Sequence, residues 1–257
     1  KNIKGVGCFP FCTMAQLLGG YSLEESNITV FGDSISKGLY LKGDRINRLE
    51  INAVQLVMDK YGIDIDNKSA FGQSLQRIYN KKVIEKYLAE IDYSRHNIAV
   101  LSLGGNDADY NWTEVAKNPT AIHDSKTPLF FFGKWLDETI RMLQSNGVHV
   151  VITSLPPVNS QRYFDNVIAR HCDREAVLRF LHDDISNISR HQECFSNLLM
   201  QRALFHGCGF VDLRTAFLMK NDFLNFLCMD GIHPNERGQA LIARTMFNHI
   251  ESRRLSA

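Results

Sequence analysis

Short apolar runs alternate with longer segments of helical periodicity along the chain, and this pattern predicts strands and helices in turn. The predicted strands cover residues 28–31, 63–67, 97–103, 148–154 and 210–213. The predicted helices cover residues 45–61, 74–91, 128–144, 195–205 and 235–251. An alternation repeated five times implies a parallel sheet with helices on both faces, joined by right-handed crossovers. The fold class predicted from the pattern is therefore α/β.

Two segments do not fit this alternation. Residues 1–27 contain Phe9-Pro10-Phe11 and Gly19-Gly20, and we expect an arm that packs on the domain or joins it to a second copy. Residues 28–257 then form a single predicted domain. Within it, residues 158–195 are longer than an ordinary connection between a strand and a helix, so they predict a helical insertion near the carboxyl ends of the strands.

Composition narrows the class of protein. The chain has 257 residues, of which 44% are apolar and 22% charged, and its formal net charge is +1. A chain of this length can bury roughly three quarters of its unfolded surface in one core. No basic block is present, which argues against a nucleic-acid partner. No apolar run approaches the roughly 20 residues that a membrane-spanning helix needs.

The cysteines bear on the cellular compartment. The six are Cys8, Cys12, Cys172, Cys194, Cys208 and Cys228. None of them has zinc-ligand spacing, and a chain of this length does not need disulfides for stability. We expect mostly free thiols and a cytoplasmic protein. Secretion is the second expectation, because Lys1 to Gly20 have two lysines and a mildly apolar run, as a signal peptide would.

Residues able to carry chemistry follow several of the predicted strands. Ser34 follows the first strand, Gly72 the second, Asn106 the third, and Asp230 and His233 the fifth. The carboxyl ends of parallel strands share one edge of a sheet, so we expect these residues to converge. A serine, a histidine base and an orienting aspartate are what acyl transfer requires. Backbone N–H groups of Ser34 and Gly72, with the Asn106 side-chain amide, would form an oxyanion hole.

Each of these residues also has an ordinary structural interpretation. Ser34 could begin a helix as its N-cap, and Gly72 could serve only to permit a turn with positive φ. Asn106 and Asp230 are both common turn residues. The joint occurrence of all these positions in one order favours the catalytic interpretation over four separate coincidences.

With these residues in place, the chain resembles the SGNH hydrolases, also called the GDSL esterase/lipase family. The first block matches Gly32-Asp33-Ser34-Ile35, and the second block matches only at Gly72. The third block, Gly-x-Asn-Asp, matches Gly104 to Asp107, and the fifth, Asp-x-x-His, matches Asp230 to His233. The resemblance covers about residues 28–250. It implies a flavodoxin-like three-layer fold with a five-stranded parallel sheet of order 2-1-3-4-5.

The resemblance and the residues together predict a serine esterase that forms an acyl-enzyme on Ser34. No cofactor and no metal ion is expected, and the expected partner is a small-molecule or glycan ester. Three alternatives stay open. The chain could be a lysophospholipase or thioesterase, a transacylase of the same family, or a non-catalytic module that binds acylated ligands.

Two segments, residues 109–127 and the insertion, are expected to lie over Ser34 and to contact the substrate. The residues expected at the substrate rim are Tyr110, Trp112, His123, Tyr163 and Phe164. Aromatic cover with a polar edge favours short esters, such as acetyl groups on a carbohydrate. The alternative is that the aromatic residues only pack the insertion onto the domain.

Overall fold

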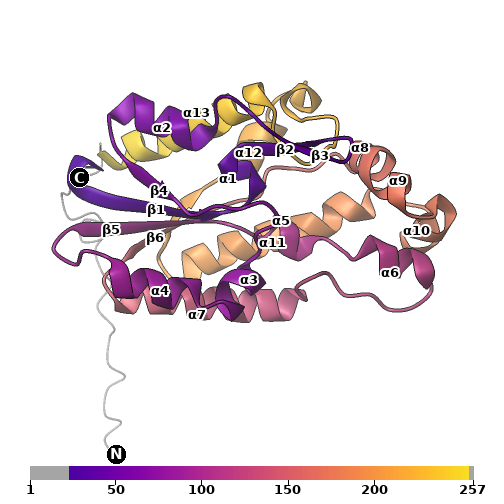
Figure 1. The fold of residues 1–257 in the computed structure, drawn as a ribbon, viewed down its shortest axis with the longest axis horizontal. Helices are drawn as coiled ribbons and strands as arrows, with labels where there is room; N and C mark the ends of the chain where they lie inside the picture. Colours follow the sequence, from indigo (N-terminus) through magenta and orange to yellow (C-terminus); the bar gives the residue numbers. More distant parts are fainter. Residues whose placement is uncertain (1–22, 255–257) are drawn as a thin grey trace, which may run out of the picture.

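The computed structural model describes residues 23–254, so the predicted arm lies almost entirely outside the described residues (Figure 1). A five-stranded parallel sheet runs through the molecule in the order β4-β1-β5-β6-β7. Its strands are β1 (Ser26–Gly32), β4 (Ile65–Asn67), β5 (His96–Ser102), β6 (His149–Thr153) and β7 (Gly209–Val211). In order along the chain this is 2-1-3-4-5, so the predicted fold class and strand order are confirmed.

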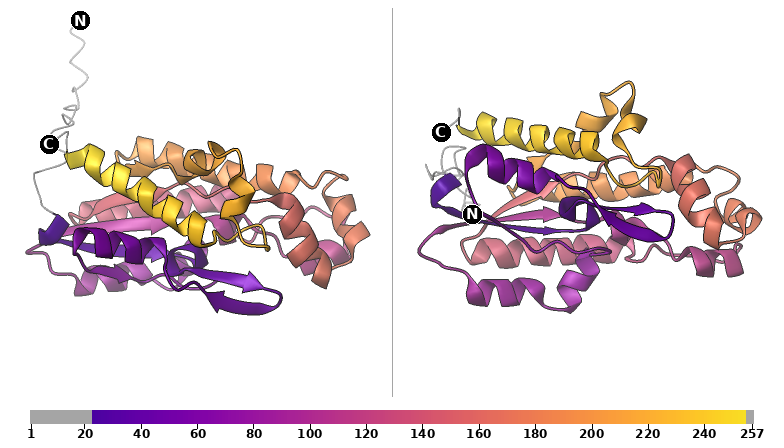
Figure 2. Two further views of the ribbon diagram at one scale, coloured as in Figure 1. Left: turned by 90° about the horizontal axis from the view of Figure 1, so that it is seen from above. Right: turned by 45° about the horizontal axis from the view of Figure 1, so that its top comes forward.

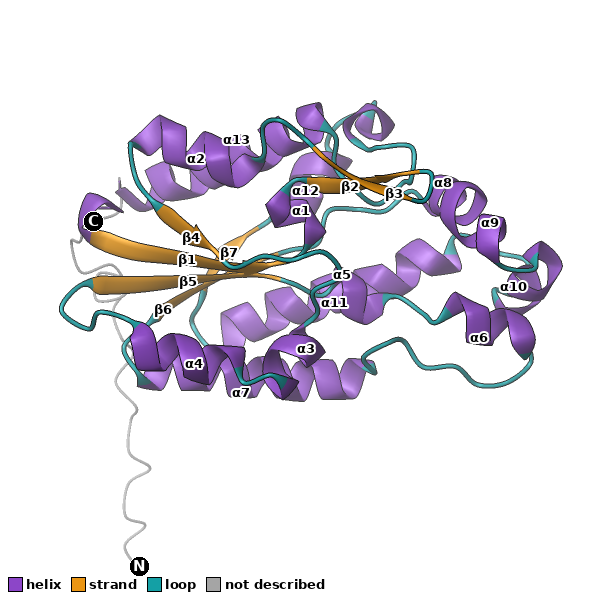
Figure 3. Cartoon of the chain, in the orientation of Figure 1, coloured by secondary structure: helices purple, strands orange, loops and turns teal. Residues whose placement is uncertain are grey.

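Helices cover both faces of the sheet (Figures 1 and 3). The helices on one face are α1 (Ser34–Lys37), α2 (Ala53–Tyr61), α12 (Leu213–Leu218) and α13 (Glu236–Arg254). The other face carries α3 (Leu75–Asn80), α4 (Val83–Glu90), α7 (Leu129–Ser145) and α11 (Asn187–Phe205). Between this second group and the sheet lies a core that contains Phe31, Leu101, Phe132, Ile140 and Phe195, each almost fully buried. Burial of large side chains on this scale is the main stabilising contribution to the fold.

The start of the first long predicted helix is wrong. Residues 39–48 form an antiparallel hairpin of β2 (Leu39–Lys42) and β3 (Arg45–Arg48), and α2 begins only at Ala53. Gly43, at the hairpin turn, has a φ of +62°, a conformation that glycine adopts without steric strain. The Asn52 side chain accepts a hydrogen bond from Gln55 N at 3.1 Å, which fixes the start of α2.

Other predicted boundaries shift for local reasons. The predicted helix over 74–91 is two helices, because Lys82 between them adopts a left-handed φ of +52°. The predicted loop after the third strand contains α5 (Gly105–Ala108) and α6 (Trp112–Lys117). Helix α11 begins at Asn187, eight residues before the predicted start.

The insertion forms a layer of its own beyond the sheet (Figure 2). Its elements are α8 (Ser160–Tyr163), the π-helix η3 (Phe164–Ile168), α9 (Ala169–His171) and α10 (Arg174–Phe180). Together with α6 they enclose a separate apolar cluster that includes Trp112, Phe164 and Val177. Two short 3-10 helices complete the described chain, η2 (Leu23–Glu25) and η4 (Phe223–Phe226).

Two expectations from composition can be compared with the described part of the chain. No helix between residues 23 and 254 combines the length and apolar character needed to cross a bilayer. The four described cysteines, Cys172, Cys194, Cys208 and Cys228, are free thiols. Cys8 and Cys12 lie outside the described residues.

Candidate active site

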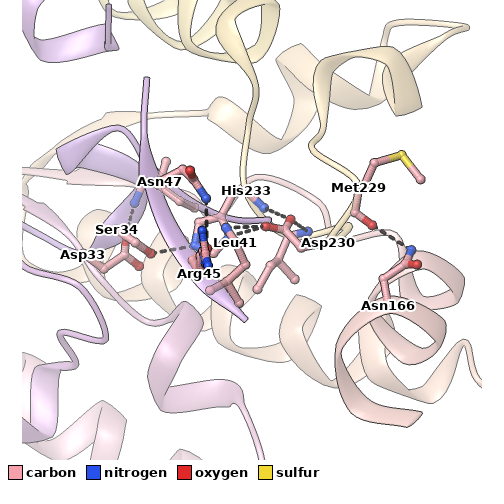
Figure 4. Close-up of polar contacts among 11 residues, drawn as sticks. Asp33, Ser34, Leu41, Arg45, Asn47, Asn166, Met229, Asp230 and His233 are labelled. Atoms are coloured by element: carbon pink, nitrogen blue, oxygen red, sulfur yellow. Dashed lines mark hydrogen bonds and ion pairs between the residues drawn. The ribbon is translucent and has the colours of Figure 1, made fainter. Parts of the chain in front are cut away.

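A hydrogen-bonded chain joins Ser34, His233 and Asp230, which come from opposite ends of the sequence (Figure 4). Ser34 Oγ lies 2.8 Å from His233 Nε2, and His233 Nδ1 lies 2.8 Å from Asp230 Oδ2. All three side chains are buried, with exposed fractions between 3% and 5%. Burial protects both hydrogen bonds from competition with water and strengthens them electrostatically.

The position of Ser34 follows from the end of β1. The strand stops at Gly32, where a Cβ would lie 2.6 Å from Ser36 Oγ and 2.7 Å from Ser69 Oγ. Only a residue without a side chain fits there, so the chain can turn tightly into α1. Asp33 caps that helix by accepting a hydrogen bond from Ile35 N at 2.9 Å.

Asp230 is held by backbone groups as well as by the imidazole. Its Oδ1 accepts from Ile232 N and His233 N, both at 3.0 Å, and its Oδ2 accepts from Leu41 N in the hairpin at 3.0 Å. Burial raises the pKa of Asp230, but the hydrogen bonds and the charge of His233 outweigh burial, and the net pKa lies below 3.8. The carboxylate is therefore ionised at neutral pH and fixes the orientation of the His233 ring.

The final helix connects this loop to the helix of Ser34. Gln239, almost fully buried, accepts from Ala53 N at 2.9 Å and donates to Ile35 O at 3.0 Å. These two bonds join α13 to both α1 and α2, so they fix His233 relative to Ser34. No local sequence signal distinguished Gln239, because its partners lie 186 and 204 residues away in the chain.

Two of the three residues expected in the oxyanion hole, Gly72 and Asn106, meet at one turn. Asn106 Nδ2 donates to Gln73 O at 2.9 Å, which places the amide beside Gly72, whose φ is +65°. Asp107 also fixes this region, because its carboxylate accepts hydrogen bonds from Leu75 N, Gln76 N and Thr127 Oγ1. An amide nitrogen has two hydrogens, so Asn106 retains one for a substrate oxygen.

Four of the five residues expected at the substrate rim pack in the apolar cluster of the insertion. Trp112, Tyr163 and Phe164 are buried in the apolar cluster of the insertion, and Trp112 Nε1 and Tyr163 OH both bond to Asp109 Oδ1 at 2.9 Å. Tyr110 packs against Trp112, Phe180 and His191 at the edge of that cluster. These contacts are those of packing residues, and a role of these residues at the rim stays a prediction.

His123 is exposed, bonded through Nε2 to Asn118 O at 2.8 Å. Its role at the rim stays a prediction.

The insertion holds the Asp230–His233 loop through polar contacts that the sequence did not indicate. Asn166 Nδ2 donates to Met229 O at 2.8 Å, and Asn159 N donates to Gly231 O at 2.7 Å. Arg162 Nη1 donates to Leu224 O at 2.8 Å. The π-helix is a rare conformation that often lies at functional sites. Here it carries Asn166 toward the loop.

The described residues 23–254 contain no group of three or more His, Cys, Asp or Glu side chains arranged to hold a metal ion.

Comparisons with known proteins agree with the fold. The model of the GDSL-like lipase/acylhydrolase family matches residues 30–241. A lipase/acylhydrolase from Enterococcus faecalis has a TM-score of 0.59 at 18% identity, covering 89% of this chain and 96% of that one. A mutant of an acetyl-xylooligosaccharide esterase from Geobacillus has a TM-score of 0.59 at 18% identity, covering 88% of this chain and 94% of that one.

A third solved structure, LAE5, an α/β hydrolase from the metagenome of Lake Arreo, has a TM-score of 0.61 at 16% identity, covering 90% of this chain and 97% of that one. A comparison with curated proteins found no match.

Gly231 provides a test of how tightly the insertion holds the loop. Its φ is +78°, and a Cβ would lie 2.7 Å from Asn159 O and 2.8 Å from Tyr163 N. Gly231→Ala should lower the free energy of unfolding by more than about 2 kcal/mol, measured by urea denaturation. Gly147→Ala is the matched control, since its φ is +74° with nothing within 4 Å, and it should lose only about 1 kcal/mol. Equal losses in the two variants would contradict the close contact.

Asp33 provides a test of pH dependence. Burial raises its pKa to about 6, and the hydrogen bond from Ile35 N and the charge of His233 offset only part of that rise. The folded chain therefore binds this proton more tightly than the unfolded chain, and stability falls as the pH rises from about 4 to 6. Asp33→Asn keeps the cap and should stabilise the protein, by at most about 3 kcal/mol at pH 7.5 and about half of that at pH 5.

Asp212, which caps α12, is the control of opposite sign. Burial raises its pKa, but hydrogen bonds from Thr215 and Ser154 outweigh burial and hold the pKa below 3.8. Asp212→Asn should therefore destabilise the protein at neutral pH. Urea unfolding at both pH values measures the two differences, and a stabilisation by Asp33→Asn that does not grow with pH would be inconsistent with a buried, high-pKa carboxyl group.

The match of the family model to residues 30–241, together with the fold shared with SGNH hydrolases, shows that the chain belongs to the GDSL-like lipase/acylhydrolase family of ester-hydrolysing enzymes.

Proposed function

We propose that the protein hydrolyses carboxylic esters through a covalent acyl-enzyme on Ser34. The observation that carries this proposal is the buried chain of two 2.8 Å hydrogen bonds from Ser34 through His233 to Asp230. A serine hydroxyl is a weak nucleophile until a base takes its proton. Few structural roles would require a buried imidazole to face a serine on one side and a carboxylate on the other.

The first half of the reaction follows from these contacts. Ser34 Oγ attacks the ester carbonyl while its proton moves to His233 Nε2. The resulting imidazolium is stabilised by Asp230, which is ionised and holds the Nδ1–H at 2.8 Å. The negative charge develops on the carbonyl oxygen, where the N–H groups of Ser34 and Gly72 and the amide of Asn106 donate to it.

The second half returns the enzyme to its starting state. His233 gives its proton to the leaving alcohol, and the bond between the carbonyl carbon and the alcohol oxygen breaks. Water then takes the place of the alcohol, gives a proton to His233 and attacks the acyl-enzyme. Release of the acid leaves Ser34 with its proton restored. The donors of the oxyanion hole serve both tetrahedral intermediates.

We infer that short acyl groups are preferred, such as acetyl groups on a carbohydrate. The aromatic residues of the insertion are buried in their own cluster, so they do not form a broad apolar surface for a lipid beside Ser34. The fold is also that of a protein described as an acetyl-xylooligosaccharide esterase, which makes acetylated glycans a reasonable first class of substrate.

One observation favours longer acyl chains as a second candidate. Phe130 and Phe131, at the start of α7, are 76% and 44% exposed. The next residue, Phe132, packs against Gly104, two residues before Asn106, so this exposed apolar surface begins near the oxyanion turn.

The nucleophile can be tested directly. Ser34→Ala should leave the fold intact and lower kcat by about 10³-fold or more, because the acyl-enzyme can no longer form. A fluorophosphonate probe should label the wild-type protein at Ser34, located by peptide mass spectrometry. Ser36→Ala is a suitable control, since this serine lies on the same helix without contacting His233. Equal labelling of the Ser34→Ala variant would place the nucleophile elsewhere.

Acyl-chain length separates the two classes of substrate. We expect kcat/KM for p-nitrophenyl esters to be highest for acetyl or propionyl esters and to fall toward longer chains. Assays with a panel of acetylated glycans and lysophospholipids then identify the preferred alcohol part of the ester. Activity that rises steadily from two to twelve carbons would overturn the short-chain inference and favour a lipid substrate bound along α7.

A further inference from the structure

A cavity of about 310 Å³ lies beside Asp230, between the hairpin and the insertion. The hairpin contributes Tyr40, Leu41, Lys42 and Gly43, the insertion contributes Asn166, Val167 and Arg170, and the loop contributes Cys228, Met229 and Asp230. Figure 4 shows how closely these segments meet, with Leu41 beside Asp230 and Asn166 beside Met229. The size suits one ring-shaped group rather than a long chain.

The place of the cavity in the reaction follows from His233. This residue must protonate the leaving alcohol, so the alcohol side of the ester has to lie on the imidazole side of Ser34. Asp230, a wall residue of the cavity, bonds the far side of that imidazole, with hydrogen bonds of 2.8 Å on each side of the ring. The cavity therefore lies on the imidazole side of Ser34, the side on which the alcohol leaves.

The charges around the cavity favour an anion. Lys42 and Arg170 both line it, and neither forms an ion pair with any residue between 23 and 254. Arg170 reaches toward the hairpin turn, since its Nη2 would lie 4.0 Å from a Cβ on Gly43, the residue after Lys42. The hairpin's own carboxylate, Asp44, is directed to His171 at 3.1 Å.

Asp230 itself is compensated by its hydrogen bonds to His233, Ile232 and Leu41, so its charge opposes an anion only weakly. Tyr40, Leu41, Val167 and Met229 supply apolar surface for the body of the bound group.

We propose that this cavity binds the leaving alcohol of the ester, and that Lys42 and Arg170 select an alcohol that carries a carboxylate or phosphate group. The inference rests on the proposed esterase function and extends it to a substrate class. An acetylated acidic sugar has the required features, a ring, an ester and an anionic substituent. Guanidinium groups bind both carboxylates and phosphates in planar geometry, so both anions are included.

The test compares esters that differ only in charge. 4-Acetoxybenzoate and its neutral isostere 4-acetoxybenzamide release alcohols of the same shape. 4-Acetoxyphenyl phosphate tests a phosphate group in place of the carboxylate. We expect wild-type kcat/KM to be roughly tenfold higher for one or both anionic esters than for the amide, mainly through a lower KM. The better of the two anions then identifies the preferred group. Because Lys42 and Arg170 are both exposed, the selectivity should decline in 0.5 M salt.

Variants assign that selectivity to the two cations. Arg170→Gln and Lys42→Gln should each lower the anionic-to-neutral ratio of kcat/KM several-fold, and the double variant should bring it close to one. Arg170→Lys keeps the charge and should retain most of the ratio. Arg179→Gln is the matched control, because Arg179 is an exposed arginine of the same insertion that does not line the cavity, and it should change neither activity nor ratio.

The possible failures are distinguishable. A wild-type ratio near one, or a ratio unchanged in the double variant, would overturn the inference. So would a failure to cleave all three 4-acetoxy esters while p-nitrophenyl acetate is still hydrolysed. Absence of hydrolysis of every ester, together with no labelling of Ser34 by the fluorophosphonate probe, would instead overturn the proposed function itself.

Discussion

The pairing of β1 with β5 determines where the chemistry of this fold can occur. The two strands run parallel over seven residues and end together, with Gly32 opposite Ser102. The turn that carries Ser34 therefore lies beside the turn that carries Asn106, and a Cβ on Gly105 would lie 3.7 Å from Asp33 Oδ2. The proposed nucleophile and one oxyanion donor are positioned by the sheet itself. The imidazole has to be delivered to the same edge by other parts of the chain.

Three buried aspartates at this edge show how hydrogen-bond donors oppose the effect of burial on the pKa of a carboxyl group. Burial raises the pKa of all three. Asp33 accepts one backbone hydrogen bond, from Ile35, and its pKa stays raised at about 6. Asp107 accepts three hydrogen bonds and its pKa is still above the ordinary value. Asp230 accepts four, one of them from His233, and its pKa falls below that value. The aspartate proposed to orient the imidazole is thus the one of the three whose pKa lies below its ordinary value.

The sequence predicted the sheet and the residues at its edge because both depend on local patterns. Buried parallel strands appear as continuous apolar runs, and the Gly32-Asp33-Ser34 and Asp230–His233 segments are short motifs whose spacing can be read directly. The hairpin was missed because Ile46 and Leu49 have helical spacing with Ala53, although a positive φ at Gly43 and a cap at Asn52 separate them. The contacts of Leu41, Asn166 and Gln239 could not be predicted, because each joins residues that are far apart in the chain and none has a motif of its own.

The insertion illustrates why the rim of a site is harder to predict than its chemistry. An aromatic residue in a loop above a sheet can face the substrate or its own neighbours, and the sequence is the same in both cases. Here Trp112, Tyr163 and Phe164 are buried in the apolar cluster that packs the insertion against α6. The polar edge of the insertion contacts the Asp230–His233 loop, through Asn166 on Met229 and through the close approach of Asn159 to Gly231. The aromatic residues thus support the segment that holds the backbone around His233. The inference about the alcohol therefore rests on Lys42 and Arg170 beside Asp230 and not on these buried aromatic residues.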